Sequence, residues 1–400
     1  MSTKTNRSSW GRGTTKPSSA HSFAFSAPLR WISRSAAIAM ILTCAAWSSA
    51  SAQHKQPVAP SVREAEQVLA PLVESYGVSG MEGPVRETVL RLLPEWARRQ
   101  TETDTAGNLW LRLGKGAPTV VYIAHTDEIG FRVTAIREDG SLELEQRGGF
   151  FSSLYESRPA LVHTTRGIVP GVFMPRDSTG ASPRRTPPSL RVDVGTATRA
   201  ATEALGVAIG SEITSPKSYA RLAGTRATGR SFDDRVGCTA LILAVRRLDP
   251  AHLRHAVIFI WSVREEIGLE GAEAAANALG ATTTRVHGID TFVSADSPVE
   301  LPTFGVAPVG RGAVARSLDN SAVTPPALVD SLVAIARGRG IALQVGTTNG
   351  GNDGSAFAAY GVPDVAVGWP LRYSHSPAEV IDLKDVVSLA EIVRATVEAW

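Results

Sequence analysis

The chain has 400 residues, enough for two domains, and its 43% hydrophobic content is ordinary for a globular protein. Its formal net charge of +3 depends on the first 52 residues, which carry six of the 41 basic residues and no acidic residue. Without them 35 basic residues face 38 acidic ones, so the charge becomes −3 and no nucleic-acid partner is expected.

The N-terminal segment, residues 1–52, is predicted to be a signal peptide. Arg30 and Arg34 precede a short apolar stretch, and Ala50-Ser51-Ala52 follows it. A basic region, a short apolar region and an A-x-A site in this order are typical of export signals. The apolar stretch is short for a bilayer span, which favours cleavage before Gln53 over an uncleaved membrane anchor. We therefore expect an exported protein, periplasmic or secreted, without a stable membrane span after cleavage.

The two cysteines add one expectation. Cys44 would leave with the leader, so Cys238 could form no intramolecular disulfide. Lipidation of Cys44 is a weaker alternative, because Thr43 is bulkier than the residue that usually precedes a lipidated cysteine. Cys238 lies in the apolar run VGCTALILAV, which predicts a buried small hydrophobe rather than a metal ligand.

After a predicted linker, residues 53–60, apolar residues recur at helical spacing through residues 61–99, with a break at VSGMEG, residues 78–83. Strands are predicted at 109–113 and 119–124, and the second leads directly into His125. An apolar run that ends in polar residues is typical of a buried parallel strand whose end lies at a site.

Residues 131–228 have a different sequence pattern, with short β-like segments in place of alternating helices and strands. They begin with a hairpin around an Asp139-Gly140 turn, continue with short β-like pieces and contain a Pro/Arg/Ser-rich loop at 174–189. We predict a small β-rich domain inserted into a catalytic α/β domain made of residues 61–130 and 229–400. Further helices are predicted at 236–248, 268–279, 326–339, 353–360 and from 384, and strands at 255–263, 286–293, 342–345 and 364–367. This alternation predicts a three-layer α/β/α body.

Five fragments carry the residues that indicate chemistry. They are HTDEIG (His125, Asp127), SFDDRVG (Asp233, Asp234), SVREEIG (Glu265, Glu266), GIDTFVSADSP (Asp290, Asp296) and RYSHSP (His375). Two histidines and three carboxylates are a ligand set for two metal ions that share a bridging carboxylate. A glutamate beside a ligand glutamate can then act as general base. The combination predicts a two-metal hydrolase.

Taken singly, the fragments differ in weight. His125 and Asp127 share one face of a strand end, so the carboxylate could hold the second ring nitrogen of a ligand histidine, but a purely structural polar pair stays open. Asp233-Asp234 alone would be an ordinary acidic helix cap. Glu265-Glu266 ends the apolar run HAVIFIWSV, where unpaired carboxylates are costly, so a functional role is favoured. His375 alone indicates little, and its interpretation as a ligand depends on the other four fragments.

The chain resembles the glutamyl/deblocking aminopeptidase family of two-metal peptidases, relatives of the tetrahedral aminopeptidases. The resemblance rests on VSGMEGPVRE, GNLW, HTDEIG, FDDRVG, EEIGLEGA and RYSHSPAEVIDLKD, which follow one another over nearly all of the mature chain. The inserted β-rich segment also falls where that family carries one. The resemblance implies the following roles: Asp233 bridges two ions, His125 and Asp290 complete one site, Glu266 and His375 complete the other, Glu265 is the base and Asp127 orients His125. It also implies a cis Asp233-Asp234 peptide, which is frequent in such enzymes.

The resemblance leaves one ligand open. Either Asp290 or Asp296 could serve, and the family pattern, an aspartate after a strand and a second one six residues later before x-Pro, favours Asp290. The implied function is an aminopeptidase that acts on short peptides with two divalent ions, zinc or else cobalt or manganese, and the resemblance leaves a homo-oligomer open. The alternatives are a related two-metal amidohydrolase or carboxypeptidase, and an inactive binding protein on the same scaffold.

Overall fold

The computed structural model describes residues 58–176, 189–294, 296 and 306–399. The predicted leader, most of the predicted linker and most of the loop at 174–189 lie outside these residues. Within them, the helices lack the combination of length and apolar character that a bilayer crossing requires.

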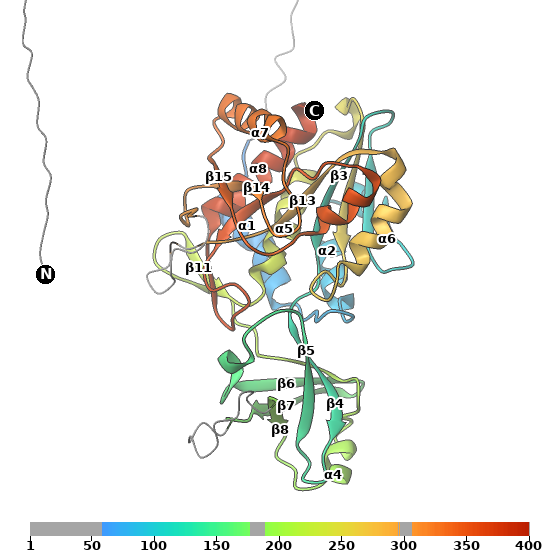
Figure 1. The fold of residues 1–400 in the computed structure, drawn as a ribbon, viewed down its shortest axis with the longest axis vertical. Helices are drawn as coiled ribbons and strands as arrows, with labels where there is room; N and C mark the ends of the chain where they lie inside the picture. The colour runs from blue at the N-terminus through green and yellow to red at the C-terminus, as the bar shows by residue number, and fades with distance from the viewer. Residues whose placement is uncertain (1–57, 177–188, 295, 297–305, 400) are drawn as a thin grey trace, which may run out of the picture. The chain divides into compact units, whose positions relative to one another are not determined.

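A mixed sheet of eight strands forms the centre of the body in the described part of the chain (Figure 1). In sheet order its strands are β1 (Thr101–Thr103), β2 (Leu109–Leu113), β12 (Ala256–Ser262), β3 (Thr119–His125), β13 (Thr283–Val293), β16 (Val367–Leu371), β14 (Ala313–Leu318) and β15 (Leu343–Thr347). Four neighbours, β12, β3, β13 and β16, run parallel. Their carboxyl ends therefore meet at one edge of the sheet.

Helices cover both faces of this sheet, which confirms the predicted three-layer body. One face packs against α1 (Val62–Glu74), α2 (Gly83–Leu92), α5 (Phe232–Val245), α7 (Pro326–Arg339) and α8 (Leu383–Ala399), and the other against α6 (Glu270–Leu279) and the 3₁₀ helix η4 (Asp353–Tyr360). Short helical turns lie at α3 (Glu95–Arg98), η2 (Pro250–His252) and η3 (Gly280–Thr282). Alternate side chains of β3 enter the two layers: Tyr122 joins the first cluster and Ile123 the second. Burial on both faces explains why this strand is continuously apolar.

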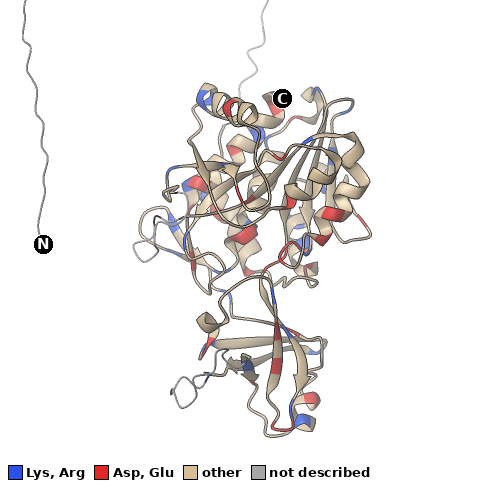
Figure 2. Cartoon of the chain, viewed as in Figure 1, with Lys and Arg blue, Asp and Glu red and all other residues tan. Residues whose placement is uncertain are grey.

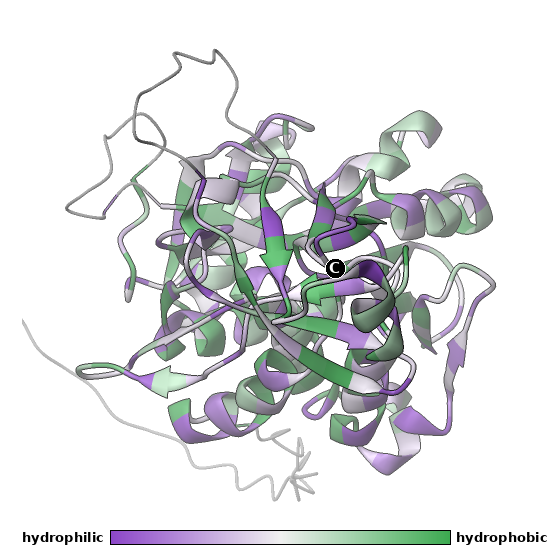
Figure 3. Cartoon of the chain, turned by 90° about the horizontal axis from the view of Figure 1, so that it is seen from below, coloured by the Kyte–Doolittle hydropathy of each residue, from purple (hydrophilic) through white to green (hydrophobic). Residues whose placement is uncertain are grey.

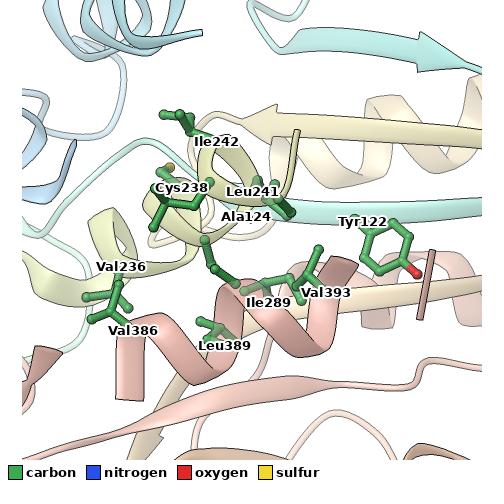
Figure 4. Close-up of a cluster of buried hydrophobic side chains, with 14 of the residues drawn as sticks. Tyr122, Ala124, Val236, Cys238, Leu241, Ile242, Ile289, Val386, Leu389 and Val393 are labelled. Carbon is green, nitrogen blue, oxygen red and sulfur yellow. The ribbon is translucent and has the colours of Figure 1, made fainter. Parts of the chain in front are cut away.

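The largest core cluster lies between the sheet, α5 and α8, where the side chains of these elements meet (Figure 4). Every residue of α5 is buried. Cys238 belongs to this helix, is fully buried and donates its thiol to the backbone carbonyl of His125, with 3.1 Å between Sγ and O. The prediction of a buried small hydrophobe is confirmed. Several helices carry both hydrophilic and hydrophobic residues (Figure 3), as expected where one side of a helix faces a core.

The inserted segment forms a closed barrel of six antiparallel strands within the described residues, which confirms the predicted β-rich insertion. Around the barrel the strands are β4 (Gly130–Ile136), β5 (Leu142–Arg147), β8 (Arg191–Asp193), β7 (Gly167–Phe173), β6 (Pro159–Thr164) and β9 (Glu212–Thr214), with η1 (Ser152–Tyr155) and α4 (Arg199–Ala204) between them. The barrel has its own core, in which the rings of Phe131, Tyr155 and Phe173 contact one another. Acidic and basic residues occur on both the barrel and the body (Figure 2).

The structure departs from the predicted elements in three places. Strand β10 (Ala220–Arg221) pairs with β11 (Arg226–Gly229), and β11 pairs in turn with β17 (Glu379–Asp382), so within the described residues the barrel strands end at Thr214, before these strands of the predicted β-rich segment. The strand predicted at 364–367 begins as an isolated parallel bridge between Asp364 and Val286, and the continuous strand β16 follows at Val367–Leu371. Strand β14 was not predicted, since its polar end, Arg316-Ser317, hides the apolar pattern.

Candidate active site

The candidate residues gather at the carboxyl edge of the parallel strands, around a cavity of about 860 Å³. Asp233, Glu265, Glu266, Asp290 and His375 line this cavity. His125, the last residue of β3, is buried beside it with 2% of its surface exposed. Because β3 and β12 are in register at His125 and Ser262, the segment that follows β12 places Glu265 and Glu266 next to the histidine.

Asp233 lies between the two histidines. Its Oδ1 is 3.2 Å from Nε2 of His125, and its Oδ2 is 3.4 Å from Nε2 of His375. Oε1 of Glu266 is also 3.4 Å from Nε2 of His375. Ligand atoms of His125, Asp233 and Glu266 lie within 4.8 Å of one another. One carboxylate that faces an imidazole nitrogen on each side is the arrangement expected of a bridge between two ions.

The local backbone separates the two adjacent aspartates. The Asp233-Asp234 peptide is cis, as the family resemblance implied. Asp234 turns away from the cavity and accepts the backbone N–H groups of His125 (3.0 Å) and Gly237 (2.9 Å). Asp234 therefore acts as an acidic helix cap, because its carboxylate accepts the N–H of the residue three positions later. Asp233 does not make such a bond in the described structure.

In both histidines Nδ1 faces an oxygen outside the cluster of candidate ligands, and Nε2 faces the Asp233 carboxylate. Nδ1 of His375 donates to the backbone carbonyl of Gly149 (2.6 Å), and Nδ1 of His125 lies 3.4 Å from Oδ1 of Asp127. Burial opposes protonation of His125, but Glu265, Asp127 and Asp233 raise its pKa well above the usual value. Imidazole nitrogens and several carboxylate oxygens that face one another form a negatively charged pocket that attracts a cation. Imidazole together with carboxylate suits zinc, cobalt or manganese. The residues present therefore fit a divalent metal centre.

Asp127 holds more of the site than His125 alone. Its carboxylate accepts the hydroxyl of Ser79 (2.6 Å) and the backbone N–H groups of Glu265 (3.0 Å) and Glu266 (3.2 Å). Asp127 is fully buried. One side chain thus fixes the histidine at the end of β3 relative to the glutamates after β12.

Glu265 points toward the same centre. Its Oε2 is 4.0 Å from Nε2 of His125, whereas Glu266 lies against His375. Burial, with Asp290 and Glu266 nearby, raises the pKa of Glu265 well above its ordinary value. A carboxylate with a raised pKa is a better proton acceptor at neutral pH than an exposed one.

The two candidate aspartates on the next segment have different surroundings. Asp290 lines the cavity, and its Oδ2 is 3.1 Å from Nη1 of Arg316. Burial raises the pKa of Asp290 to about 7, against the opposing charge of Arg316. Asp296 instead forms two 2.8 Å bonds with Arg372 and accepts the backbone N–H of Val309. This geometry favours Asp290 over Asp296 as a ligand.

Sequence reasoning missed several buried residues that support the site. Glu379 accepts the backbone N–H groups of Phe232 (2.7 Å) and His375 (3.0 Å), and burial raises its pKa to about 8. Arg235 donates to the carbonyls of Thr126 (2.5 Å) and Asp127 (3.0 Å). Ser79, Arg235 and Glu379 lie within VSGMEG, FDDRVG and SPAEV, respectively. A polar or charged residue inside a motif already quoted for the family resemblance was therefore the feature that could have identified them.

A mixed α/β sheet with two histidines and several carboxylates beside a cavity at its carboxyl edge defines a metal-dependent hydrolase. The family model of the M42 glutamyl aminopeptidases matches residues 107–392. The chain therefore belongs to the M42 family and is a metallo-aminopeptidase that hydrolyses N-terminal residues.

Individual relatives agree with this assignment. The chain is 28% identical to the glutamyl aminopeptidase of Lactococcus lactis over 342 residues, 82% of this chain and 94% of that one. It is 29% identical to the lysyl aminopeptidase of Pyrococcus furiosus over 349 residues, 83% of this chain and 96% of that one. The TET1 peptidase of Pyrococcus horikoshii superposes with a TM-score of 0.76 at 31% identity, covering 84% of this chain and all of that one.

Proposed function

We propose that this chain removes N-terminal residues from short peptides with two divalent ions, most simply zinc. The placement of Asp233 between His125 and His375 carries this proposal. His125 and Asp290 would complete one site and Glu266 and His375 the other. Ions held there would polarise the scissile carbonyl and lower the pKa of water.

The protein supplies proton transfer and orientation. Glu265 takes the proton of the attacking water and passes it to the leaving amine. Asp127 orients His125 and, through the backbone N–H groups of Glu265 and Glu266, keeps the base and the neighbouring ligand in place. Burial of Glu265 raises its pKa above the ordinary value, which favours uptake of a proton.

The test compares two neighbouring glutamates. Glu265→Gln keeps the size of the side chain and removes its basicity, so metal content should stay near two ions per chain while kcat falls by about 10²–10⁴. Glu266→Gln should instead lower metal content. We would measure metal by mass spectrometry and kinetics with aminoacyl-anilides. Near wild-type turnover of Glu265→Gln, or cleavage of N-acylated substrates only, would refute the aminopeptidase mechanism.

We also propose export and self-association. The leader at residues 1–52 supports export, and N-terminal sequencing of protein from the native cell envelope should then find Gln53 first. An intact leader in the membrane fraction would contradict cleavage. The TET1 peptidase can assemble into a tetrahedron or a large octahedral shell; by analogy this chain forms a homo-oligomer, which light scattering would detect.

A further inference from the structure

The cavity that holds the candidate metal ligands has a second, apolar wall, formed by Phe150, Phe151, Leu269 and Val293. We propose that this wall binds an apolar side chain at the N-terminus of the peptide, and that Phe151 is a specificity-determining residue. This inference rests on the proposed aminopeptidase function, and it names the class of residue that the enzyme removes.

The backbone around Phe151 is held on both sides. The carbonyl of Gly149 accepts Nδ1 of His375 at 2.6 Å, which ties this loop of the barrel to a candidate ligand. The half-buried ring of Phe150 packs against the core of the barrel, 5.1 Å from the rings of both Phe131 and Tyr155. The carbonyl of Phe151 accepts the N–H of Leu154 at the start of η1. Phe151 is therefore presented at the cavity by a fixed loop.

Phe151 is also unusually accessible, with 79% of its surface exposed. An exposed phenylalanine leaves a large apolar area in water, and such surfaces mark binding sites when they lie beside a cavity. Leu269 and Val293 come from the start of α6 and the end of β13, so three distant segments supply the apolar wall. This convergence is what an apolar side chain of a substrate would need.

The charges of the cavity do not favour a charged side chain. Among its described lining residues, Arg316 is the only charged one outside the candidate catalytic set. Its guanidinium is buried, and both Nη atoms are already bonded: Nη1 to Asp290 (3.1 Å) and the carbonyl of Thr291 (2.9 Å), and Nη2 to Asp319 (2.8 Å) and the carbonyl of Gly351 (2.9 Å), whereas Nε has no described partner. An acidic side chain would have to displace these partners to pair with both Nη atoms, and a basic one would meet no carboxylate outside the catalytic set among those residues.

A neutral polar group completes the cavity. Oδ1 of Asn349 is buried, and no described residue donates a hydrogen bond to it. An acceptor in this position suits an N–H group of a peptide backbone. The cavity thus combines an apolar wall for a side chain with an acceptor for the main chain, which is the usual composition of a specific ligand site.

The experiment measures kcat/KM for leucyl-, phenylalanyl-, alanyl-, glutamyl- and lysyl-anilides. The wild type should prefer leucyl and phenylalanyl substrates, since apolar contacts discriminate by roughly 10–200-fold. Phe151→Ser should lower kcat/KM for these two by about tenfold, mainly through KM, because the contact exists in both ground and transition states. Alanyl hydrolysis and metal content should not change, and Phe151→Leu should restore most of the preference.

The matched control is Ile168→Ser, which removes another exposed apolar side chain of the barrel, on β7 and outside the cavity. It should leave the substrate ranking unchanged. A preference for glutamyl or lysyl substrates would overturn the proposal, as would an equal loss on all five substrates. A change in oligomeric mass in Phe151→Ser with an unchanged ranking would show that Phe151 packs against a second copy instead. Hydrolysis of none of the anilides would refute the proposed function itself.

Discussion

At the residue scale, the site depends on carboxylates that serve several donors at once. Asp127 accepts three hydrogen bonds and faces His125, while Glu379 joins the segments that carry Asp233 and His375. A carboxylate can do this because both its oxygens are acceptors, whereas an amide presents one acceptor and one donor group. Isosteric substitutions at these positions therefore test positioning without removing a proposed ligand.

Asp127→Asn should weaken metal binding by about 10–100-fold, because partners that orient a ligand histidine typically contribute that much. The new amide would also present its NH₂ group to the backbone N–H of Glu265 or Glu266, which now donates to a carboxylate oxygen. This would displace the candidate base, so kcat should fall as well. Ser79→Ala removes one donor only and should have a smaller effect. Competition with a chelating dye would measure the affinity. Equal affinities for Asp127→Asn and the wild type would mean that Asp127 does not position His125.

A buried histidine away from the site gives a pH prediction. Burial lowers the pKa of His287 to about 3, while its ring stacks on Tyr122 and Nδ1 donates to the carbonyl of Val365. The unfolded chain takes up this proton near pH 6.5, whereas the folded chain does not until about pH 3. The contribution of neutral His287 to the free energy of unfolding is thus fully present above pH 6.5. It is lost as the pH falls from 6.5 toward 3, by up to about 1.4 kcal/mol per pH unit.

His287→Gln should therefore flatten the dependence of the free energy of unfolding on pH over about pH 4–6, as measured by urea titration. His252→Gln is the control, because His252 is on the surface with 66% of its side chain exposed. Comparing the variants with the wild type cancels protons linked to metal binding. A slope for His287→Gln equal to that of the wild type would show that His287 does not titrate differently on folding.

At the element scale, the packing of α5 against α8 supports the ligands of the sheet edge. Asp233 and Asp234 lie at the start of α5, and this helix is buried along its whole length. Helix α8 covers it with an apolar face that includes Val386, Leu389 and Val393 (Figure 4). The position of Asp233 thus depends on a helix that is itself held by the C-terminal helix.

Leu389→Ala should destabilise the fold by about 2–5 kcal/mol, the range for truncating a buried leucine. Lys384→Ala, at an exposed position of the same helix, should change stability by less than about 0.5 kcal/mol. Denaturant unfolding compares the two variants. A decrease in the free energy of unfolding of less than about 1 kcal/mol for Leu389→Ala would mean that α8 is not well packed in the core.

At the scale of the whole molecule, the barrel and the body both contribute to one cavity. The body supplies the candidate ligands, and the barrel supplies the carbonyl of Gly149 and the aromatic residues beside it. The two ends of the insertion are adjacent, because Phe131 of β4 and Ile213 of β9 are direct partners in neighbouring strands. The barrel can thus interrupt the α/β chain without disturbing the central sheet.

A short Gly-Ser linker from Gly130 to Thr214 in place of the barrel should leave the body folded, as circular dichroism would show. Metal affinity should fall by about 10–100-fold, because His375 loses its acceptor. Hydrolysis of leucyl-anilide should fall further, since Phe151 is also removed. Full activity of the shortened chain would show that the barrel is dispensable for the site.

Much of this protein follows from local sequence alone. Residues 120–124 are apolar on both faces, so they form a buried strand, and His125 therefore lies at a sheet edge. Adjacent glutamates after the apolar run of β12 favoured a functional role, because burying unpaired carboxylates is costly. The alternation of such strands with amphipathic helices predicted the layered body, and the hairpin with its Asp139-Gly140 turn predicted the start of the barrel.

Tertiary structure decided what depends on contacts between distant segments. The partner of Asp296 is Arg372 and that of Asp290 is Arg316, and neither pairing has a local signature. Likewise, β11 pairs with β17 about 150 residues later, a pairing that has no local signature either. Glu379 and Ser79 gained their roles only when the chain brought Phe232, His375 and Asp127 to them. Local periodicity specifies strands and their ends, whereas the donor that each buried carboxylate meets is set by packing across the whole chain.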